Sequence, residues 1–351
     1  MDGKLEDTFG RKISYVRIAV TDRCNFRCVY CMPPEGVPER THESMLSAEQ
    51  IARFVRVAAR EGVSHVRLTG GEPLVSRRII PLVRDIRSIP GIEDVALTTN
   101  GVLLPRLAAS LRDAGLDRVN VSLDTLDPAQ FRAITRGGEL EQTLAGIDAA
   151  LAAGFEPVKI NCVVVRRLKQ DLFGLAKMTL DRPLHVRFIE YMPIGRDDGR
   201  PFEATDAQDP SVFDSSRWNA GDTVPSEELV RRLSAEGERA GVGALMPVGE
   251  DSGPAGAGPA RYWRYAGAAG TVGCISAMSN HFCARCNRMR LTVDGAIRPC
   301  LFSDAEYPVF DALRAGDDER IRAVFRAAVA HKPRQHAVIA GTERYMSQIG
   351  G

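Results

Sequence analysis

The first half of the chain alternates short apolar runs with longer segments in which apolar residues recur every three or four positions. The short runs are rich in Val, Ile and Leu, which is typical of strands buried on both faces of a sheet. Their predicted ranges are 13–20, 64–69, 93–99, 117–123, 157–165 and 184–190. Six strands that alternate with helices predict a parallel sheet. Because six units are fewer than the eight of a closed barrel, we expect an open partial barrel.

Local signals place the ends of several of the intervening helices. Ser47 is followed by Gln50 three residues later, which is a capping-box pattern and predicts a helix that runs to Gly62. Gly115 and Gly154 each follow a helical pattern and fit the position just after a helix end.

The pattern changes after residue 194. Residues 195–225 are polar and contain many Gly and Pro residues, so we expect a long loop, followed by a helix that starts at Ser226. Residues 249–260 predict a flexible surface loop. Short strands are expected at 261–266, 271–276 and 288–293, with a turn at Asp294-Gly295, and helices within 308–330. We therefore predict two domains, a partial barrel at 1–225 and a smaller α+β domain at 226–351.

Composition and charge narrow the classes of protein. The chain has 351 residues, of which 44% are hydrophobic, and a formal net charge of +1. Such a balance provides no overall field to attract a polynucleotide or an anionic membrane. The charged N-terminus is unlike a signal peptide, and no apolar run is long enough to span a bilayer. We expect a cytoplasmic protein, whose thiols stay reduced.

Three cysteines lie just after the first predicted strand, Cys24, Cys28 and Cys31, with the spacing C-x3-C-x2-C. A 4Fe–4S cluster normally takes four cysteines, so three leave one iron open for an outside ligand. This arrangement resembles that of radical S-adenosylmethionine (SAM) enzymes, and Tyr30 would then lie beside the adenine. A structural zinc site is an alternative that requires four ligands. A disulfide set requires an even number of cysteines and an oxidising compartment.

A second motif, Thr69-Gly70-Gly71-Glu72-Pro73, follows the second predicted strand. Paired glycines allow the backbone to approach a ligand closely, and open parallel sheets bind ligands at the carboxyl ends of their strands. We expect Glu72 or the local backbone to accept a hydrogen bond from the ammonium group of SAM.

A second triad of cysteines, Cys283, Cys286 and Cys300, has the spacing C-x2-C-x13-C. Three cysteines again favour an iron–sulfur cluster with one open iron. A zinc site with His281 as its fourth ligand remains the alternative.

Arginines accompany this second triad. Arg288 and Arg290 are two positions apart in a predicted strand, so they point to the same face, directly after Cys286. Arginine suits phosphate because its planar group bonds two oxygens at once. Arg17 lies on the first predicted strand and Arg67 on the second. Together these residues predict a polyphosphate site.

The chain ends in Gly350-Gly351. A terminal glycine pair is usually frayed. Because glycine has no Cβ, such a pair can also enter a narrow site, and we hypothesise that this one does.

Together these motifs resemble the GTP 3′,8-cyclase family, the radical SAM enzymes that open molybdenum-cofactor biosynthesis. The segments that carry the resemblance are VTDRCNFRCVYCMPPEG (20–36), VRLTGGEPL (66–74), TTNG (98–101), VNVSLDTLD (119–127), VRFIEYMPIG (186–195), SNHFCARCNRMRLTVDG (279–295) and the terminal glycines. The chain is longer than the family pattern at about 196–222 and 249–260.

The resemblance implies roles for individual residues. It implies two 4Fe–4S clusters, one on Cys24, Cys28 and Cys31, the other on Cys283, Cys286 and Cys300 with its open iron facing guanine. The implied SAM contacts are Tyr30, Gly71, Glu72, Ser122 and Met192. The implied GTP contacts are Arg17, Arg67, Thr98, Lys159, Arg288 and Arg290. The residues with implied catalytic roles are Arg17, Arg288, Arg290, Gly350 and Gly351.

The resemblance also implies a fold and a reaction. The fold is an incomplete (βα)6 radical SAM barrel with a smaller C-terminal α+β domain that carries the second cluster, in a homodimer. SAM is the cosubstrate, and a low-potential electron donor is required. Hydrogen abstraction at C3′ of GTP and C3′–C8 bond formation give 3′,8-cyclo-7,8-dihydro-GTP, the substrate of cyclic pyranopterin monophosphate synthase.

Two alternatives remain at this stage. One is another radical SAM enzyme with an auxiliary cluster, such as a peptide modifier, although those generally have more cysteines. The other is a non-enzymatic iron–sulfur or zinc protein.

Overall fold

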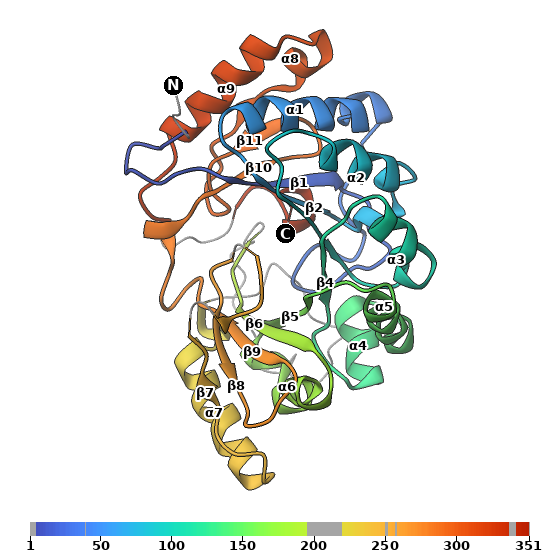
Figure 1. Ribbon diagram of the computed structural model, residues 1–351, viewed down its shortest axis with the longest axis vertical. Coiled ribbons are helices and arrows are strands. Elements are labelled where there is room, and N and C mark those ends of the chain that lie inside the picture. Colours follow the sequence, from blue (N-terminus) through green and yellow to red (C-terminus); the bar gives the residue numbers. More distant parts are fainter. Residues whose placement is uncertain are drawn as a thin grey trace.

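A computed structural model describes residues 5–38, 40–194, 220–249, 252–256, 258–336 and 342–350. Within these ranges the strands form one sheet in the order β12-β11-β10-β1-β2-β3-β4-β5-β6-β9-β8-β7. The strands curve around a central space, and most of the helices lie outside them (Figure 1). Among the described residues, no helix has both the length and the apolarity that crossing a bilayer requires.

Six parallel strands form the predicted partial barrel. They are β1 (Tyr15–Thr21), β2 (His65–Gly70), β3 (Asp94–Thr99), β4 (Arg118–Ser122), β5 (Val158–Val164) and β6 (Leu184–Glu190). Each lies within two residues of its predicted bounds. The strands are buried because helices cover their outer face, as their continuous apolar runs indicated.

The helices of the barrel follow the strands in turn. They are α1 (Ala48–Arg60), α2 (Ile79–Arg87), α3 (Leu104–Asp113), α4 (Pro128–Thr135), α5 (Leu140–Ala152), α6 (Leu172–Asp181) and α7 (Ser226–Arg239). The capping box is confirmed, because Ser47 Oγ accepts from the Gln50 N–H and Gln50 Oε1 accepts from the Ser47 N–H. Gly115 and Gly154 follow the ends of α3 and α5 with positive φ angles, where glycine costs least.

The C-terminal strands extend the barrel sheet at both of its edges. They are β7 (Met246–Pro247), β8 (Arg261–Arg264), β9 (Thr271–Ile275), β10 (Arg288–Leu291), β11 (Ala296–Arg298) and β12 (Tyr307–Pro308). β9 pairs with β6, and β10 pairs with β1, both in parallel. The predicted turn at Asp294-Gly295 joins β10 to the antiparallel β11. The division of the chain at residue 225 stays a prediction.

Two C-terminal helices, α8 (Phe310–Ala315) and α9 (Asp318–Ala330), pack against α1 of the barrel (Figure 1). Phe325 of α9 contacts Phe54 of α1 edge-to-face, with 5.8 Å between the ring centroids. Asp318 accepts from Arg53 at 2.7 Å. The first and last helices of the chain therefore share one apolar contact, so the C-terminal region is part of the same core.

Glu190 joins the C-terminal region to the open edge of the barrel. It ends β6 and is buried. Its Oε1 accepts from the N–H and the hydroxyl of Ser226 and from the hydroxyl of Ser279. Its Oε2 accepts from the N–H groups of Met278 and Ser279, each at 2.9 Å. One carboxylate thus fixes the start of α7 and the segment after β9.

We predict that Glu190→Ala strongly destabilises the fold. Hydrogen bonds to a charged group contribute about 1.5–3 kcal/mol each, and the buried donors would be left without a partner. The free energy of unfolding should fall by about 3 kcal/mol or more, measured by denaturant titration. Glu228→Ala is the matched control, because Glu228 forms an exposed ion pair with Arg166 worth about 0–1 kcal/mol. Equal losses in the two variants would contradict this role of Glu190.

Candidate active site

The first cysteine triad lies on the loop between β1 and α1. Cys24, Cys28 and Cys31 are half-buried, and all three thiols are free. The Phe26 N–H donates to the sulfur of Cys24 at 3.4 Å, and the backbone N–H of Ser347 donates to that of Cys31. Burial raises the pKa of the Cys24 thiol to about 11 and, together with the nearby Cys24, that of Cys31 to about 12.

The donors of the first triad have the chemistry of ligands to a 4Fe–4S cluster. The thiols act on each other electrostatically, so they face a common space. Among the residues that the structure describes, no three His, Cys, Asp or Glu side chains converge on one metal ion. In a 4Fe–4S cluster each cysteine binds a different iron, so its ligands need not converge on one point. Backbone N–H groups that point at the sulfurs are the outer contacts that tune such clusters.

Tyr30 is held in place by a carboxylate that the sequence analysis missed. Its hydroxyl donates to Asp124 at 2.7 Å, and Asp124 also accepts from the Val163 N–H at 2.8 Å. Burial raises the pKa of Asp124 to about 6. Asp124 follows β4 by two residues, so its place at a strand end was the available signal.

The TGGEP motif lies at the end of β2, beside the end of β1. Its residues Gly71 and Glu72 differ in their surroundings. The Glu72 carboxylate is buried and accepts from Thr99 Oγ1 and the Asn100 N–H, both at 2.7 Å. Burial raises its pKa to about 7. Whether Glu72 or the local backbone contacts the SAM ammonium stays a prediction. A Cβ on Gly71 would lie 2.2 Å from the Arg23 carbonyl oxygen, so this position needs glycine.

The other two predicted SAM contacts lie at the same edge of the sheet. Ser122 is the last residue of β4, and Met192 comes two residues after β6; both are half-buried. The carboxyl ends of β1, β2, β4 and β6 thus bring together the first triad and each predicted SAM contact that the structure describes.

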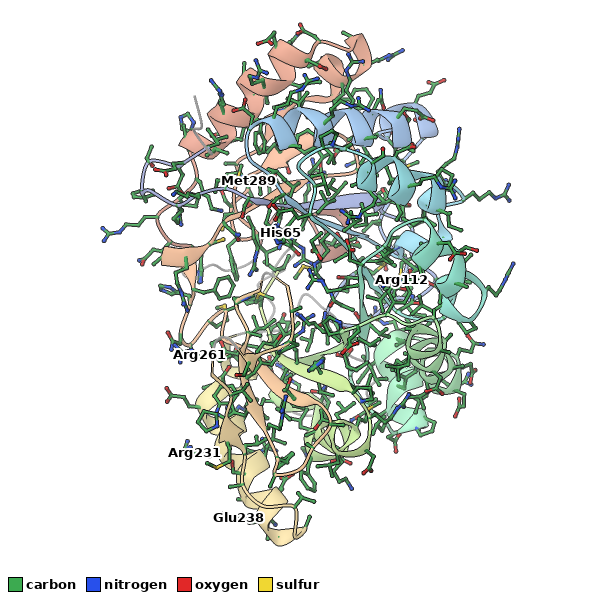
Figure 2. All side chains as sticks on the ribbon, viewed as in Figure 1. His65, Arg112, Arg231, Glu238, Arg261 and Met289 are labelled. Carbon is green, nitrogen blue, oxygen red and sulfur yellow. The ribbon has the colours of Figure 1, made fainter. Side chains whose placement is uncertain are left out.

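Arginines from three neighbouring strands line the barrel interior. Arg17 on β1 lies directly between Arg290 on β10 and Arg67 on β2 in the strand register. Two positions along β1, on the same face of the sheet, Tyr15 lies between Arg288 and His65. Figure 2 shows His65 near the middle of the molecule. The predicted pairing of Arg288 and Arg290 on one face of a strand therefore joins them to the arginines of the barrel.

The cations of this interior repel one another. Loss of hydration, with Arg290 next in effect, holds the pKa of Arg17 well below its usual value. Burial and Arg288 lower the pKa of Arg290 to about 10. Burial, then Arg187, lowers the pKa of Lys159 to about 6. Buried cations are normally paired with anions, so this space favours a polyanionic ligand.

Hydrogen bonds within the interior orient these groups. Arg67 donates through Nε to the Tyr15 hydroxyl and, through Nη1, to Thr98 Oγ1 at 3.4 Å. The Arg288 guanidinium carbon lies 5.9 Å from the centre of the Tyr15 ring. Arg187 of β6, which the sequence analysis missed, donates to Asn161 Oδ1 at 2.6 Å. On β6, His185 lies opposite Lys159, and Arg187 is two positions further along on the same face. The periodicity of the strand was therefore the available signal for Arg187.

Ala255, in the described part of the predicted loop at 249–260, contacts side chains of this interior. The carbonyl oxygen of Ala255 accepts from Lys159 Nζ at 2.6 Å and from Arg118 Nη1 at 2.9 Å. Arg118 also pairs with Asp94. Lys159, a predicted GTP contact, thus donates to the backbone carbonyl of Ala255 in this structure. The sequence analysis did not foresee this contact, because the loop was expected on the surface.

The second triad lies where β10 and β11 join the barrel edge. Cys283 belongs to the short 3-10 helix η9 (Cys283–Arg285), Cys286 follows it, and Cys300 comes two residues after β11. The three thiols are free and half-buried. Burial raises the pKa of Cys286, but Lys332, Arg288 and the Arg288 N–H together outweigh it, so the pKa is lowered. Cations therefore lie beside Cys286, whereas burial raises the pKa of Cys283.

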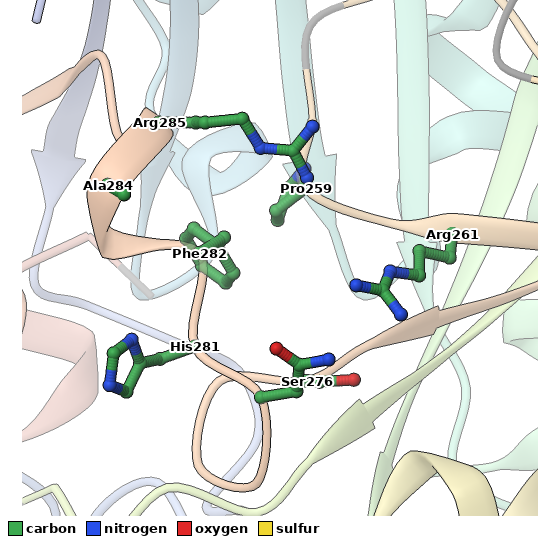
Figure 3. Close-up of a pocket in the computed structure, with 8 residues that line it drawn as sticks. Pro259, Arg261, Ser276, His281, Phe282, Ala284 and Arg285 are labelled. Atoms are coloured by element: carbon green, nitrogen blue, oxygen red, sulfur yellow. The ribbon is translucent and has the colours of Figure 1, made fainter.

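A pocket opens beside the second triad (Figure 3). The guanidinium groups of Arg261 on β8 and Arg285 on η9 extend into it. The pocket is lined by Pro259, Arg261, Ser276, Asn280, His281, Phe282, Ala284 and Arg285. His281, the fourth ligand in the zinc alternative, packs edge-to-face on His336 with 5.3 Å between ring centroids.

The C-terminal tail lies against the barrel strands. The 3-10 helix η10 (Met346–Gln348) contacts β1 and β2. Arg290 Nη1 donates to the carbonyl oxygens of Ile349, at 3.1 Å, and Gly350. Gly350 has a φ of 74°, and a Cβ there would lie 2.6 Å from Thr69 Oγ1. Gly351 lies outside the described residues.

Comparison with known proteins identifies the family. Residues 18–174 match the Radical SAM superfamily, and residues 211–338 match the family described as Molybdenum Cofactor Synthesis C. The GTP 3′,8-cyclase of Pelotomaculum thermopropionicum is 49% identical over 99% of this chain and 100% of its own length. The chain belongs to the GTP 3′,8-cyclase family. The GTP 3′,8-cyclase of Geobacter sulfurreducens is 44% identical, with 99% and 100% of the two chains covered.

Among solved structures, the chain resembles Streptococcus suis SuiB bound to S-adenosylmethionine, with a TM-score of 0.55. The match has 17% identity and covers 89% of this chain and 67% of SuiB. At this identity the likeness concerns the fold, and it agrees with the predicted radical SAM partial barrel. Membership of the superfamily implies a 4Fe–4S cluster and SAM binding for this chain.

Proposed function

We propose that this chain converts GTP to 3′,8-cyclo-7,8-dihydro-GTP, the first step of molybdenum-cofactor biosynthesis. The observation that carries the proposal is a polycationic barrel interior bordered by two cysteine triads. Family membership over nearly the whole chain supports the same activity. No observation favours the alternative of a peptide-modifying enzyme.

The residues of the first triad would hold the SAM-binding cluster. When bound, the cluster would supply the electron that cleaves SAM, so that the 5′-deoxyadenosyl group could take the 3′ hydrogen of GTP and C3′ could bond to C8. One further electron from the low-potential donor and one proton would complete the product. Tyr30, fixed by Asp124, would hold the adenine. The backbone around Gly71, with Ser122 and Met192, would orient the rest of SAM. The protein's part is positioning, while the cofactor supplies the reactivity.

The cationic interior would hold the triphosphate. Arg17, Arg67 and Lys159 project from the barrel strands, and Arg288 and Arg290 from the neighbouring β10. A triphosphate carries enough negative charge to offset the repulsion among these cations. Thr98, which already accepts from Arg67, would give the phosphate a neutral donor.

We propose a second 4Fe–4S cluster on Cys283, Cys286 and Cys300. Three free thiols, with Lys332 and Arg288 beside Cys286, support it, because positive charge stabilises a thiolate. The open iron of this cluster would face the guanine. We also propose, from the resemblance, a cytoplasmic homodimer that takes electrons from a low-potential donor and passes its product to cyclic pyranopterin monophosphate synthase.

Arg288→Ala should weaken GTP binding. A charge-assisted hydrogen bond contributes about 1.5–3 kcal/mol, and each 1.4 kcal/mol changes affinity about tenfold. We expect a loss of roughly 10- to 100-fold in GTP affinity with nearly unchanged SAM affinity, measured by equilibrium binding at equal iron content. Guanosine, which has no phosphates, should bind the variant and the wild type alike. Unchanged GTP affinity would remove Arg288 from the phosphate site.

GTP binding should be coupled to proton uptake by Lys159. Its pKa of about 6 leaves it mostly neutral at pH 8, and a bound triphosphate favours the charged form and raises that pKa. The complex therefore holds more protons than the free protein, so GTP affinity should fall as pH rises above 6. Calorimetry at pH 8 in buffers of different ionisation enthalpy should report uptake of about one proton per GTP. Lys159→Gln should abolish it, and no uptake by the wild type would refute the coupling.

The proposed activity and the role of the tail can be tested together. Anaerobic enzyme with GTP, SAM and a reductant should give the cyclised product by mass spectrometry. Deleting Gly350-Gly351, or extending the chain beyond Gly351, should suppress the product by about 100-fold, because a displacement of about 1 Å in a reactive site has that effect. SAM cleavage should continue without cyclisation. An N-terminally tagged chain is the control; equal product from both tagged forms would show that the tail is irrelevant.

A further inference from the structure

A buried lysine lies beside the second cysteine triad. Lys332 comes two residues after the end of α9 and is 3% exposed. Its ammonium group donates to the carbonyl oxygens of Arg288, at 2.7 Å, and Pro299, at 2.6 Å. The first carbonyl is two residues after Cys286 and the second immediately precedes Cys300. One side chain therefore connects the two segments that carry these cysteines.

Lys332 also acts electrostatically on the sulfur of Cys286. An ammonium group has three N–H donors and no lone pair. Two of these donors bond the carbonyl oxygens, which leaves the third for the sulfur. Burial lowers the pKa of Lys332, whereas Cys286 and Cys300 act to raise it. The charge also acts on Cys300.

The backbone of the same segment is tied to the remaining cysteine of the triad. Arg11, a buried residue before β1, donates to the carbonyl oxygens of Cys283, at 2.8 Å, and Pro333, at 2.7 Å. Asp7 in turn accepts from Arg11 Nε at 2.5 Å. Residues 332–333 therefore reach Cys286 and Cys300 through a side chain, and Cys283 through Arg11.

We propose that Lys332 is a positioning residue of the second cluster: its ammonium group sets the separation of Cys286 and Cys300, and its charge favours the reduced cluster. This inference rests on the proposed second 4Fe–4S cluster. Reduction adds one negative charge to a cluster, so a fixed cation nearby stabilises the reduced form. Cluster potentials depend on charge and on hydrogen bonds to sulfur.

The test isolates the second cluster in a full-length chain with Cys24, Cys28 and Cys31 changed to Ala. Into this parent we introduce Lys332→Met, which keeps the length without the charge, and Lys332→Arg, which keeps the charge. Iron content and the midpoint potential, followed by electron paramagnetic resonance, are measured after anaerobic reconstitution. Lys332→Met should reduce the ratio of reduced to oxidised cluster about tenfold at a fixed potential, a shift of about 59 mV for a one-electron couple. Lys332→Arg should restore most of that ratio.

If Lys332→Met does not assemble the second cluster, a separate measurement still tests the proposal. In a chain with both triads intact, Lys332→Met that loses second-cluster iron but still cleaves SAM would support the positioning role. Iron content and potential equal to those of the parent would overturn the role of Lys332. If the parent itself holds zinc or no metal, the proposed second cluster fails, and the inference fails with it.

Discussion

The parallel pairing of β10 with β1 is the constraint on which the site depends. It sets Arg290 beside Arg17 and Arg288 beside Tyr15, and it brings the second triad to the edge of the barrel opposite the β6 edge. Without this pair, Arg288 and Arg290 would have no fixed relation to Arg17 and Arg67. The contact of α9 with α1 stabilises the pair from outside, and Glu190 fixes the other edge of the sheet.

The two triads differ in their electrostatic surroundings, and the difference follows from the elements that hold them. Burial and the carboxylate of Asp124 raise the pKa of Cys28. Lys332 and Arg288 act in the opposite direction on Cys286. In the proposed function, the first cluster donates an electron to SAM and so requires a low potential. The cations beside Cys286 would favour the reduced state of the proposed second cluster.

Local signals in the sequence were sufficient for the six barrel strands and the capping box at Ser47, because these depend on neighbouring residues. The strand periodicity also placed Arg288 and Arg290 on one face. Long-range contacts left no such signal: Asp124 reaches Tyr30 across 94 residues, and Ala255 reaches Lys159 across 96. Lys332 appeared as an ordinary residue after a helix, since only the folded chain brings it to Cys286. Such contacts join residues that are far apart in the sequence, so the periodicity of apolar residues gives no sign of them.

Arg290 links the tail to the proposed phosphate site. Its Nη1 donates to the carbonyl oxygens of Ile349 and Gly350, while a guanidinium group has five N–H donors in one plane. The donors on its other nitrogens can bond a phosphate without releasing the tail. In the proposed function, the triphosphate and the tail would then share one rigid group, so the position of each depends on the other. Lysine would not serve here, because its three donors diverge from one atom and do not form a planar fork.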